Sequence, residues 1–141
     1  FGQSNYGAAK AGIAGFTRVV ALEVGKYGAT CNVISPGAAT RMTIPLMEAR
    51  GVDPATVRRG PEEVSPAVVW LATPAAQHFN GQIIQAGAGL IGIMQQPALI
   101  KTLRNEHRWT LEELDLAMPR LLDAKKAHDE RVKKEGEAQP W

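Results

Sequence analysis

Apolar residues fill nearly every position of a long segment near the start of the chain, residues 6–24. Its polar positions are few, namely Lys10, Thr17, Arg18 and Glu23. A helix that is apolar around its whole circumference is typical of one buried on both faces. Three internal glycines cost helix stability, roughly 1 kcal/mol each relative to alanine, which suits the close approach of another backbone. Gly25 and Gly28 are expected to end this helix.

Two short runs of β-branched and aliphatic residues predict strands. Residues Thr30–Ser35 form the first, which Pro36 and Gly37 end, and Gly81–Ala86 form the second. A strand that follows a helix and a glycine-containing turn is the second half of a βαβ unit. The pattern therefore predicts an α/β fold with a parallel sheet and buried strands.

The segment between the two strands predicts further helices. Residues 38–60 mix apolar side chains with proline and glycine, which favours short helices in an excursion from the sheet. Ser65 is expected to cap the next helix, because Pro66 then occupies its first position. That helix is expected to run to Ala72.

Charge divides the chain at Pro97. Residues 1–96 carry 7 Lys/Arg and 5 Asp/Glu, whereas residues 97–141 carry 9 of each. We therefore expect a core domain over 1–96 and a solvated helical extension over 97–141. In the extension, Thr110 and Glu113 match a capping box, and Pro119 is expected to kink or restart the helix that follows.

Composition narrows the classes of protein. A net charge of +2 gives no support for nucleic-acid binding, and no apolar run approaches the ~20 residues of a membrane span, so a soluble, cytoplasmic protein is expected. The single cysteine, Cys31, falls in an expected buried strand and forms no internal disulfide. His78, His107 and His128 share no metal-ligand spacing, so no metal site is expected.

Tyr6 and Lys10 are the candidate chemical pair. Four residues apart on one helix, they lie on the same face about one turn from each other. A neighbouring ammonium favours the ionised form of a phenol, so such a pair can provide a tyrosine that works as an acid or base at physiological pH. Taken alone, the spacing is a weak signal, and an ordinary surface pair explains it better.

The surrounding sequence carries more specific information. Asn5-Tyr6-Gly-Ala-Ala-Lys10 leads through the helix to Asn32-Val-Ile-Ser-Pro36-Gly37-Ala-Ala-Thr40. In order and spacing, over roughly residues 1–90, this run resembles the catalytic helix and following strand of the short-chain dehydrogenase/reductase family. The resemblance implies a Rossmann-type doubly wound parallel sheet, of which this chain holds the C-terminal portion. It also implies NAD or NADP as cofactor and hydride transfer between an alcohol and a ketone.

The resemblance implies a role for each matching residue. Tyr6 would be the general acid/base, and Lys10 would hold the nicotinamide ribose and assist Tyr6. Pro36 and Gly37 would lie beside the nicotinamide, and Thr40 would bond its carboxamide or a phosphate. This agrees with the rule that ligands of open α/β sheets bind outside the carboxyl ends of the strands.

Substrate hints are less specific. The apolar side chains of Ile44, Leu46 and Met47 would form a substrate-side lid for a lipophilic substrate, or serve only to pack the lid. The segment from Gly81 to Gly92 and the Trp-Thr-x-Glu-Glu tail resemble the hydroxyacyl-CoA and hydroxysteroid branch of the family, which implies an acyl-CoA or steroid-like alcohol or ketone. Arg58 and Arg59 would suit a CoA phosphate or form a solvated pair.

Several family features do not match. The glycine-rich nucleotide turn, the selector of NAD or NADP and the catalytic serine all belong before the tyrosine in the family, and Ser4 is too close to Tyr6 to be that serine. Gly87-x-Gly89-x-x-Gly92 has the nucleotide-binding spacing, but Pro97 leaves no room for the required helix. We therefore expect a family fragment with little activity by itself.

Other classes of function remain open at this stage. The chain could act as a non-catalytic module that forms homo-oligomers through its first helix and last strand, because open sheet edges and apolar faces favour association. A truncated protein with a hydrolytic activity is a third hypothesis, although no Gly-x-Ser-x-Gly motif supports it.

Overall fold

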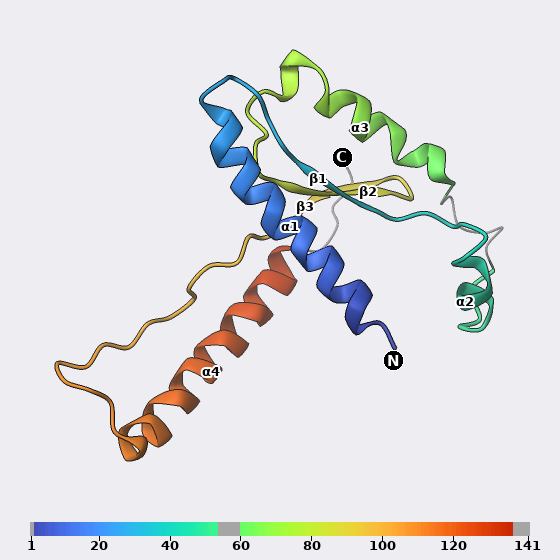
Figure 1. Ribbon diagram of the computed structural model, residues 1–141. Helices are drawn as coiled ribbons and strands as arrows, with labels where there is room; N and C mark the ends of the chain where they lie inside the picture. The colour runs from blue at the N-terminus through green and yellow to red at the C-terminus, as the bar shows by residue number, and fades with distance from the viewer. Residues whose placement is uncertain (1, 54–59, 137–141) are drawn as a thin grey trace. The chain divides into compact units, whose positions relative to one another are not determined.

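The computed structural model describes residues 2–53 and 60–136, which divide into two compact units, 1–96 and 97–141 (Figure 1). The first unit contains three α-helices, three strands and two 3₁₀ turns among its described residues. In chain order these are α1 (Ser4–Gly25), β1 (Val33–Pro36), α2 (Ile44–Glu48), η2 (Pro61–Glu63), α3 (Ser65–Leu71), η3 (Pro74–Ala76), β2 (Ile83–Gly87) and β3 (Leu90–Ile93). The second unit contains α4 (Leu111–Glu135).

The sheet has three strands in the order β1-β2-β3. β1 and β2 are parallel, with Val33 opposite Ile83, which confirms the predicted α/β arrangement. β3 is antiparallel to β2, with Ile84 opposite Ile93. This third strand was not predicted, because its glycine-interrupted sequence hides the alternation of a strand. β1 also begins later than expected, so Cys31 lies just before the strand and is only partly buried.

The Gly-x-Gly-x-x-Gly run forms the hairpin between β2 and β3. Gly87 pairs with Leu90, which leaves Ala88 and Gly89 as a two-residue loop. Both loop residues have positive φ, 57° and 71° respectively. This is the backbone of a type I′ turn, whose twist matches that of the flanking strands. The glycines therefore serve a turn, and the next helix in the described chain begins only at Leu111.

Gly87 allows the end of β1 to approach the end of β2 very closely. Its φ is 134°, and a Cβ built on it would stand 2.1 Å from the carbonyl oxygen of Gly37. The same two segments are joined by a backbone hydrogen bond, in which the N–H of Gly37 donates to the carbonyl oxygen of Ala86 at 2.9 Å. The segment that leaves β1 is therefore held against β2 by backbone alone.

Two asparagine side chains fix the opposite end of the sheet. The Nδ2 of Asn80 donates to the carbonyl oxygen of Ala21 in α1 at 2.9 Å, and its Oδ1 accepts from the N–H of Cys31 at 2.9 Å. Asn32 donates to the carbonyl oxygen of Phe79 at 2.7 Å and accepts from the N–H of Gln82 at 3.0 Å. We call these four bonds the asparagine clamp. They tie α1 and the starts of β1 and β2 together.

The expectation that α1 is buried on both faces is wrong for this chain. Only Thr17 and Ala21 are buried, each with 4% of its surface exposed. Phe16 and Leu22 are 68% and 83% exposed. One face of α1 packs near the start of β2, where Ala21 lies next to Gly81. A Cβ built on Gly81 would lie 3.3 Å from the Cβ of Ala21. The rest of the apolar surface of α1 has no cover among the described residues.

The helix after the lid segment differs at its start from the prediction. Ser65 is the first residue of α3 rather than its cap, and Val64 precedes the helix without a side-chain capping bond. Pro66 still lies in the first turn, where its missing N–H costs nothing. The ring of Trp70 meets Phe79 edge to face at 5.1 Å between centroids. This aromatic contact connects α3 to the segment that enters β2.

The capping box of α4 is confirmed. Thr110 Oγ1 accepts from the N–H of Glu113 at 3.2 Å, and Glu113 Oε2 accepts from the N–H of Thr110 at 2.9 Å. Of the kink or restart expected at Pro119, the restart is wrong, because α4 continues through Pro119 to Glu135. One missing hydrogen bond is not sufficient to end a helix of 25 residues with a closed capping box. Within the described part of the chain, no helix has the length and hydrophobicity needed to cross a membrane.

The hairpin predicts opposite responses at two neighbouring positions. Ala88→Asn should stabilise the fold by about 0.5–1 kcal/mol, because asparagine tolerates the left-handed backbone better than alanine. Gly87→Ala should destabilise it by about 2 kcal/mol or more, since its Cβ would overlap the Gly37 carbonyl. Urea unfolding of both variants measures the difference. Equal stabilities would contradict the positive φ values on which the prediction rests.

The cap of α4 predicts a local response to acid. The hydrogen bond from the Thr110 amide holds the pKa of Glu113 below its ordinary value of 4.5, with further bonds from Asn105 and His107. A carboxyl with a lowered folded pKa stabilises the fold above its unfolded pKa, and this stabilisation is lost as pH falls through the folded value.

Amide hydrogen exchange at residues 110–114 should therefore accelerate as pH falls below about 4.5, after correction for intrinsic exchange rates. Glu113→Gln retains a side-chain acceptor for the Thr110 amide but carries no charge, so its corrected exchange should not change over the same range. Glu112→Gln, on the neighbouring residue, is the matched control and should behave as the wild type. A pH response that persists in Glu113→Gln would assign it to another group.

Candidate active site

Tyr6 and Lys10 meet on the first and second turns of α1. The Nζ of Lys10 lies 5.2 Å from the centroid of the Tyr6 ring. Tyr6 is 59% exposed, so its hydroxyl is open to a ligand. The Oδ1 of Asn5 accepts from the N–H of Tyr6 at 2.8 Å, which satisfies an amide at the start of the helix. The structure thus brings the predicted pair together on an open face.

The end of β1 supplies the second part of the site. Pro36 is the last residue of the strand and is exposed, and Gly37 follows it as the partly buried residue held by Ala86. No side chain of Gly37 narrows the space at this position. A ligand that lies at the strand end would therefore meet backbone and the proline ring.

Thr40 and Thr43 form a hydroxyl pair in the loop after β1. Thr43 Oγ1 accepts from the N–H of Thr40 at 2.8 Å, and the two hydroxyl oxygens are 3.2 Å apart. Thr43 Oγ1 also lies 3.2 Å from the carbonyl oxygen of Ala38. Sequence reasoning selected Thr40 and missed Thr43. The Thr-x-x-Thr spacing just before a short helix is the signal that identifies Thr43 as the residue shaping this loop.

The expected lid residues lie on the short helix α2. Leu46 is 54% exposed, whereas Ile44 and Met47 are partly covered. Met42, just before α2, is 87% exposed. The structure therefore presents apolar side chains to solvent on this segment, as a lid for a lipophilic molecule would require. Arg58 and Arg59 lie outside the described residues.

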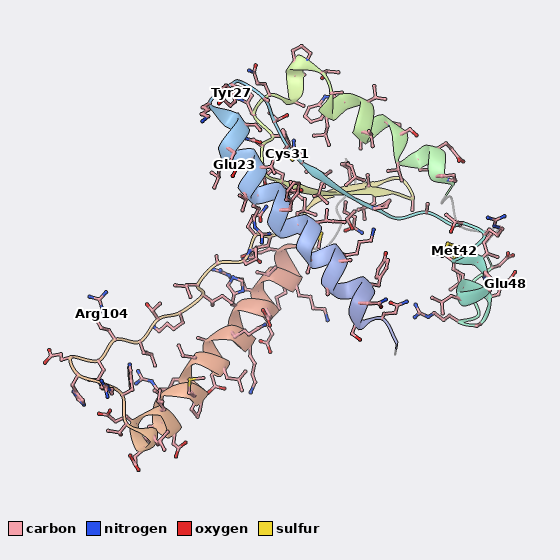
Figure 2. The ribbon with its side chains drawn as sticks, in the orientation of Figure 1. Glu23, Tyr27, Cys31, Met42, Glu48 and Arg104 are labelled. Atoms are coloured by element: carbon pink, nitrogen blue, oxygen red, sulfur yellow. The ribbon has the colours of Figure 1, made fainter. Side chains whose placement is uncertain are left out.

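These parts lie toward one end of the first unit. In Figure 2, Met42 and Glu48 mark the α2 end, while Tyr27 and Cys31 mark the other end, where α1 finishes. Tyr6 and Lys10 belong to the beginning of α1, and Figure 1 shows that end of the helix next to the N-terminus, away from the end that leads to β1. α1 therefore runs antiparallel to β1 and brings its first turns toward the carboxyl end of that strand, as a βαβ crossover does.

The chemical groups available are a phenol, an ammonium and a hydroxyl pair. Such donors suit the hydroxyls of a ribose, a carboxamide or a phosphate. Among residues 2–53 and 60–136, no three His, Cys, Asp or Glu side chains gather in a way that could hold a metal ion. The open arrangement at a strand end thus fits an organic cofactor with polar groups.

Comparison with known proteins places this arrangement in a family. The model of the family described as enoyl-(acyl carrier protein) reductase matches residues 2–91. Hydroxyacyl-CoA dehydrogenase ChsB1 of Mycobacterium tuberculosis is 44% identical over 88 residues, which cover 58% of this chain and 26% of that protein. The 3-oxoacyl-[acyl-carrier-protein] reductase FabG of Vibrio harveyi is 40% identical, over 63% of this chain and 39% of that protein.

Peroxisomal multifunctional enzyme type 2 of Mus musculus is 40% identical, over 65% of this chain and 12% of that protein. The chain therefore spans well under half of the length of these relatives. The crystal structure of a short chain dehydrogenase from Mycobacterium avium superposes with a TM-score of 0.70 at 35% identity, over 87% of this chain and 38% of that one. With the family match, the parallel β1–β2 pair and the Tyr6–Lys10 contact, we conclude that the chain belongs to the short-chain dehydrogenase/reductase family.

Proposed function

We propose that this chain supplies the acid/base part of an NAD(P)-dependent oxidoreductase that interconverts a secondary alcohol and a ketone. The observation that carries the proposal is the contact of Lys10 with the Tyr6 ring on the first turns of α1. Tyr6 is open to solvent, and the strand end at Pro36 and Gly37 lies toward the same end of the unit. Family membership supports this function, since the relatives include proteins named dehydrogenases and reductases.

Each residue has a defined part in the proposed reaction. The cofactor, when bound, supplies or accepts the hydride. In ketone reduction the Tyr6 hydroxyl gives its proton to the substrate oxygen, and in alcohol oxidation the Tyr6 oxygen takes that proton. The Lys10 ammonium donates to the ribose hydroxyls. Pro36 and Gly37 line the nicotinamide, and Thr40 bonds its carboxamide or a phosphate.

The substrate that we propose is a 3-hydroxyacyl or 3-oxoacyl thioester. Its support is twofold: the names of the relatives specify hydroxyacyl-CoA and 3-oxoacyl carrier-protein substrates, and Leu46 and Met42 expose apolar surface on the lid. An acyl chain would cover that surface. A steroid-like alcohol presents a similar apolar body and is the alternative substrate. The turnover measurement with NADH and NADPH distinguishes the two cofactors.

A second candidate function, homo-oligomerisation, rests on a separate observation. Phe16, Val19 and Leu22 expose much of their surface on α1, at 68%, 54% and 83%. Ile91 and Ile93 do the same on β3, one of the two edge strands of the described sheet. Apolar helix surface and an open edge strand favour pairing with a second copy. Such association is compatible with catalysis and would be seen as a slow tumbling rate of the chain.

Binding of nicotinamide mononucleotide tests the proposed cofactor residues in the chain itself. In an NMR titration the amides of residues 6–10 and 37–40 should shift together. Lys10→Met should weaken binding about tenfold, because a charge-assisted bond to the ribose is lost. Lys26→Met is the matched control, since Lys26 makes the same kind of contact with the Tyr27 ring at 4.9 Å. Equal effects of the two substitutions would contradict the site.

Turnover tests the role of Tyr6. The part of the Vibrio harveyi reductase that precedes the region similar to this chain is joined to the N-terminus of this chain. Reduction of a 3-oxoacyl thioester by this fusion is then followed with NADH and with NADPH. Tyr6→Phe should lower turnover by about 10²–10⁴-fold, the usual contribution of a general acid. Tyr27→Phe, which changes the only other tyrosine of the chain, should leave it nearly unchanged. An active Tyr6→Phe fusion would contradict the proposed role.

A further inference from the structure

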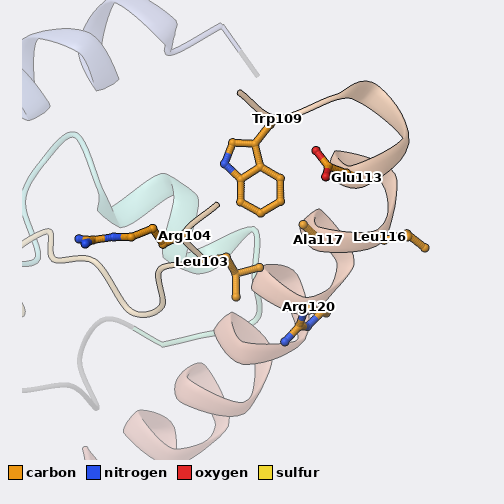
Figure 3. A pocket seen from close by; sticks show the side chains of 7 residues that line it. All are labelled: Leu103, Arg104, Trp109, Glu113, Leu116, Ala117 and Arg120. Atoms are coloured by element: carbon orange, nitrogen blue, oxygen red, sulfur yellow. The ribbon is translucent and has the colours of Figure 1, made fainter. Parts of the chain in front are cut away.

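The second unit contains a pocket of its own. A cavity of about 370 Å³ lies between residues 103–109 and the first half of α4 (Figure 3). Its lining residues are Leu103, Arg104, Trp109, Glu113, Leu116, Ala117 and Arg120. Volumes of this order accommodate small organic ligands. Neither the family match, which ends at residue 91, nor the proposed oxidoreductase site includes these residues.

One side of the pocket is flat and apolar. The indole of Trp109 faces the pocket across from Leu103, and Ala117, which is 7% exposed, lies between them on α4 (Figure 3). The small side chain of Ala117 leaves room beside the indole. An indole face with adjacent aliphatic groups suits a planar ring, because stacking and burial of apolar area act together.

The loop that carries Trp109 is fastened to α4 through one carboxylate. Glu113 accepts from the N–H of Thr110 at 2.9 Å and from Asn105 at 3.2 Å, and its other oxygen lies 3.0 Å from His107 Nε2. Three contacts to one side chain hold residues 105–110 in place before any ligand arrives. Preorganisation of this kind reduces the entropy cost of binding.

The pocket is lined by two basic side chains and one acidic side chain, and in the part of the chain that the structure describes only the acidic one is hydrogen-bonded. Arg104 and Arg120 both line the pocket, although the guanidinium of Arg104 points away from Trp109 in Figure 3, and within the described residues neither makes an ion pair. The single carboxylate, Glu113, is already bonded on both oxygens. Elsewhere on α4, Lys125, Lys126 and Arg131 have acidic partners, namely Asp129, Asp123 and Glu135. The pocket therefore has an excess of positive charge with free donors, which favours an anion.

We propose that this pocket binds a small ligand that joins a planar aromatic ring to a phosphate group, the chemistry shared by nucleotides and nucleotide-containing coenzymes. The ring stacks on Trp109 beside Leu103 and Ala117, and the phosphate accepts hydrogen bonds from Arg120, and from Arg104 once its exposed side chain turns toward the pocket. The ligand needs both the ring and the phosphate. The apolar side chains offer a phosphate no hydrogen-bond donor, and the arginine side chains make no specific contact with a ring.

NMR titration of the isotopically labelled 141-residue chain tests this with defined probes: AMP, adenosine, inorganic phosphate, CoA and NAD⁺. AMP should shift the indole N–H of Trp109 and the amide of Ala117, with a Kd about tenfold below those of adenosine and phosphate. If CoA or NAD⁺ binds more tightly than AMP, the ligand is that coenzyme, and equal affinities assign the pocket to a free nucleotide. Each of these results supports the proposal.

Two substitutions on one helix provide the control. Arg120→Gln should raise the Kd of AMP about tenfold by removal of a charge-assisted hydrogen bond. Arg131→Gln is matched to it, since Arg131 also lies on α4 but pairs with Glu135 at 3.9 Å and does not line the pocket. Arg104→Gln provides a second test if Arg120→Gln perturbs the helix.

Three results would overturn the proposal: phosphate binding as tightly as AMP, shifts confined to residues outside the pocket, or equal AMP affinities of Arg120→Gln and Arg131→Gln. These readouts are separate from those of the oxidoreductase site, because nicotinamide mononucleotide is followed at residues 6–10 and 37–40. Failure of one proposal is therefore distinguishable from failure of the other.

Discussion

The first unit depends on the two bonds that the Asn80 side chain makes. Its amide group donates to the Ala21 carbonyl in α1, and its carbonyl group accepts from the N–H of Cys31, just before β1. One side chain thus sets the position of the helix relative to the strand. Tyr6 lies 15 residues before Ala21, about 22 Å along a helix, so a small rotation at the clamp becomes a large displacement at the phenol. The position of Tyr6 at one end of the unit therefore depends on the hydrogen bonds of Asn80 at the other end.

Much of the fold follows from the sequence because local signals agree with tertiary packing. The apolar run of α1, the Pro36-Gly37 end of β1 and the Thr110 capping box each have a local cause, and the structure contains all three. The misses have tertiary causes. β3 is held by its pairing with β2 rather than by its own pattern, and Pro119 is tolerated because the rest of a long helix supports it. An apolar surface predicts that a helix is buried but not which partner covers it. The prediction for α1 therefore failed, because much of its apolar surface is exposed among the described residues.

The candidate site was predictable to a similar extent. The i, i+4 spacing of Tyr6 and Lys10 is sufficient to predict their contact, which the structure contains. Apart from the Thr-x-x-Thr spacing, nothing in the sequence selects Thr43, because its importance comes from bonds to backbone and to Thr40 that only the folded loop creates. Gly87 was visible only as part of a misleading motif. Its requirement for glycine arises from the nearby carbonyl of Gly37, a contact between segments 50 residues apart.

The asparagine clamp positions the candidate active site at the far end of α1. The most direct measurement is the affinity of Asn80→Ala for nicotinamide mononucleotide, taken where circular dichroism shows the variant fully folded. The Kd should rise several-fold although Asn80 is remote from the ligand, with partial recovery in Asn80→Asp, which keeps the acceptor for the N–H of Cys31. An unchanged affinity in a folded Asn80→Ala would contradict the claim, since Tyr6 and Lys10 would then be positioned without the clamp.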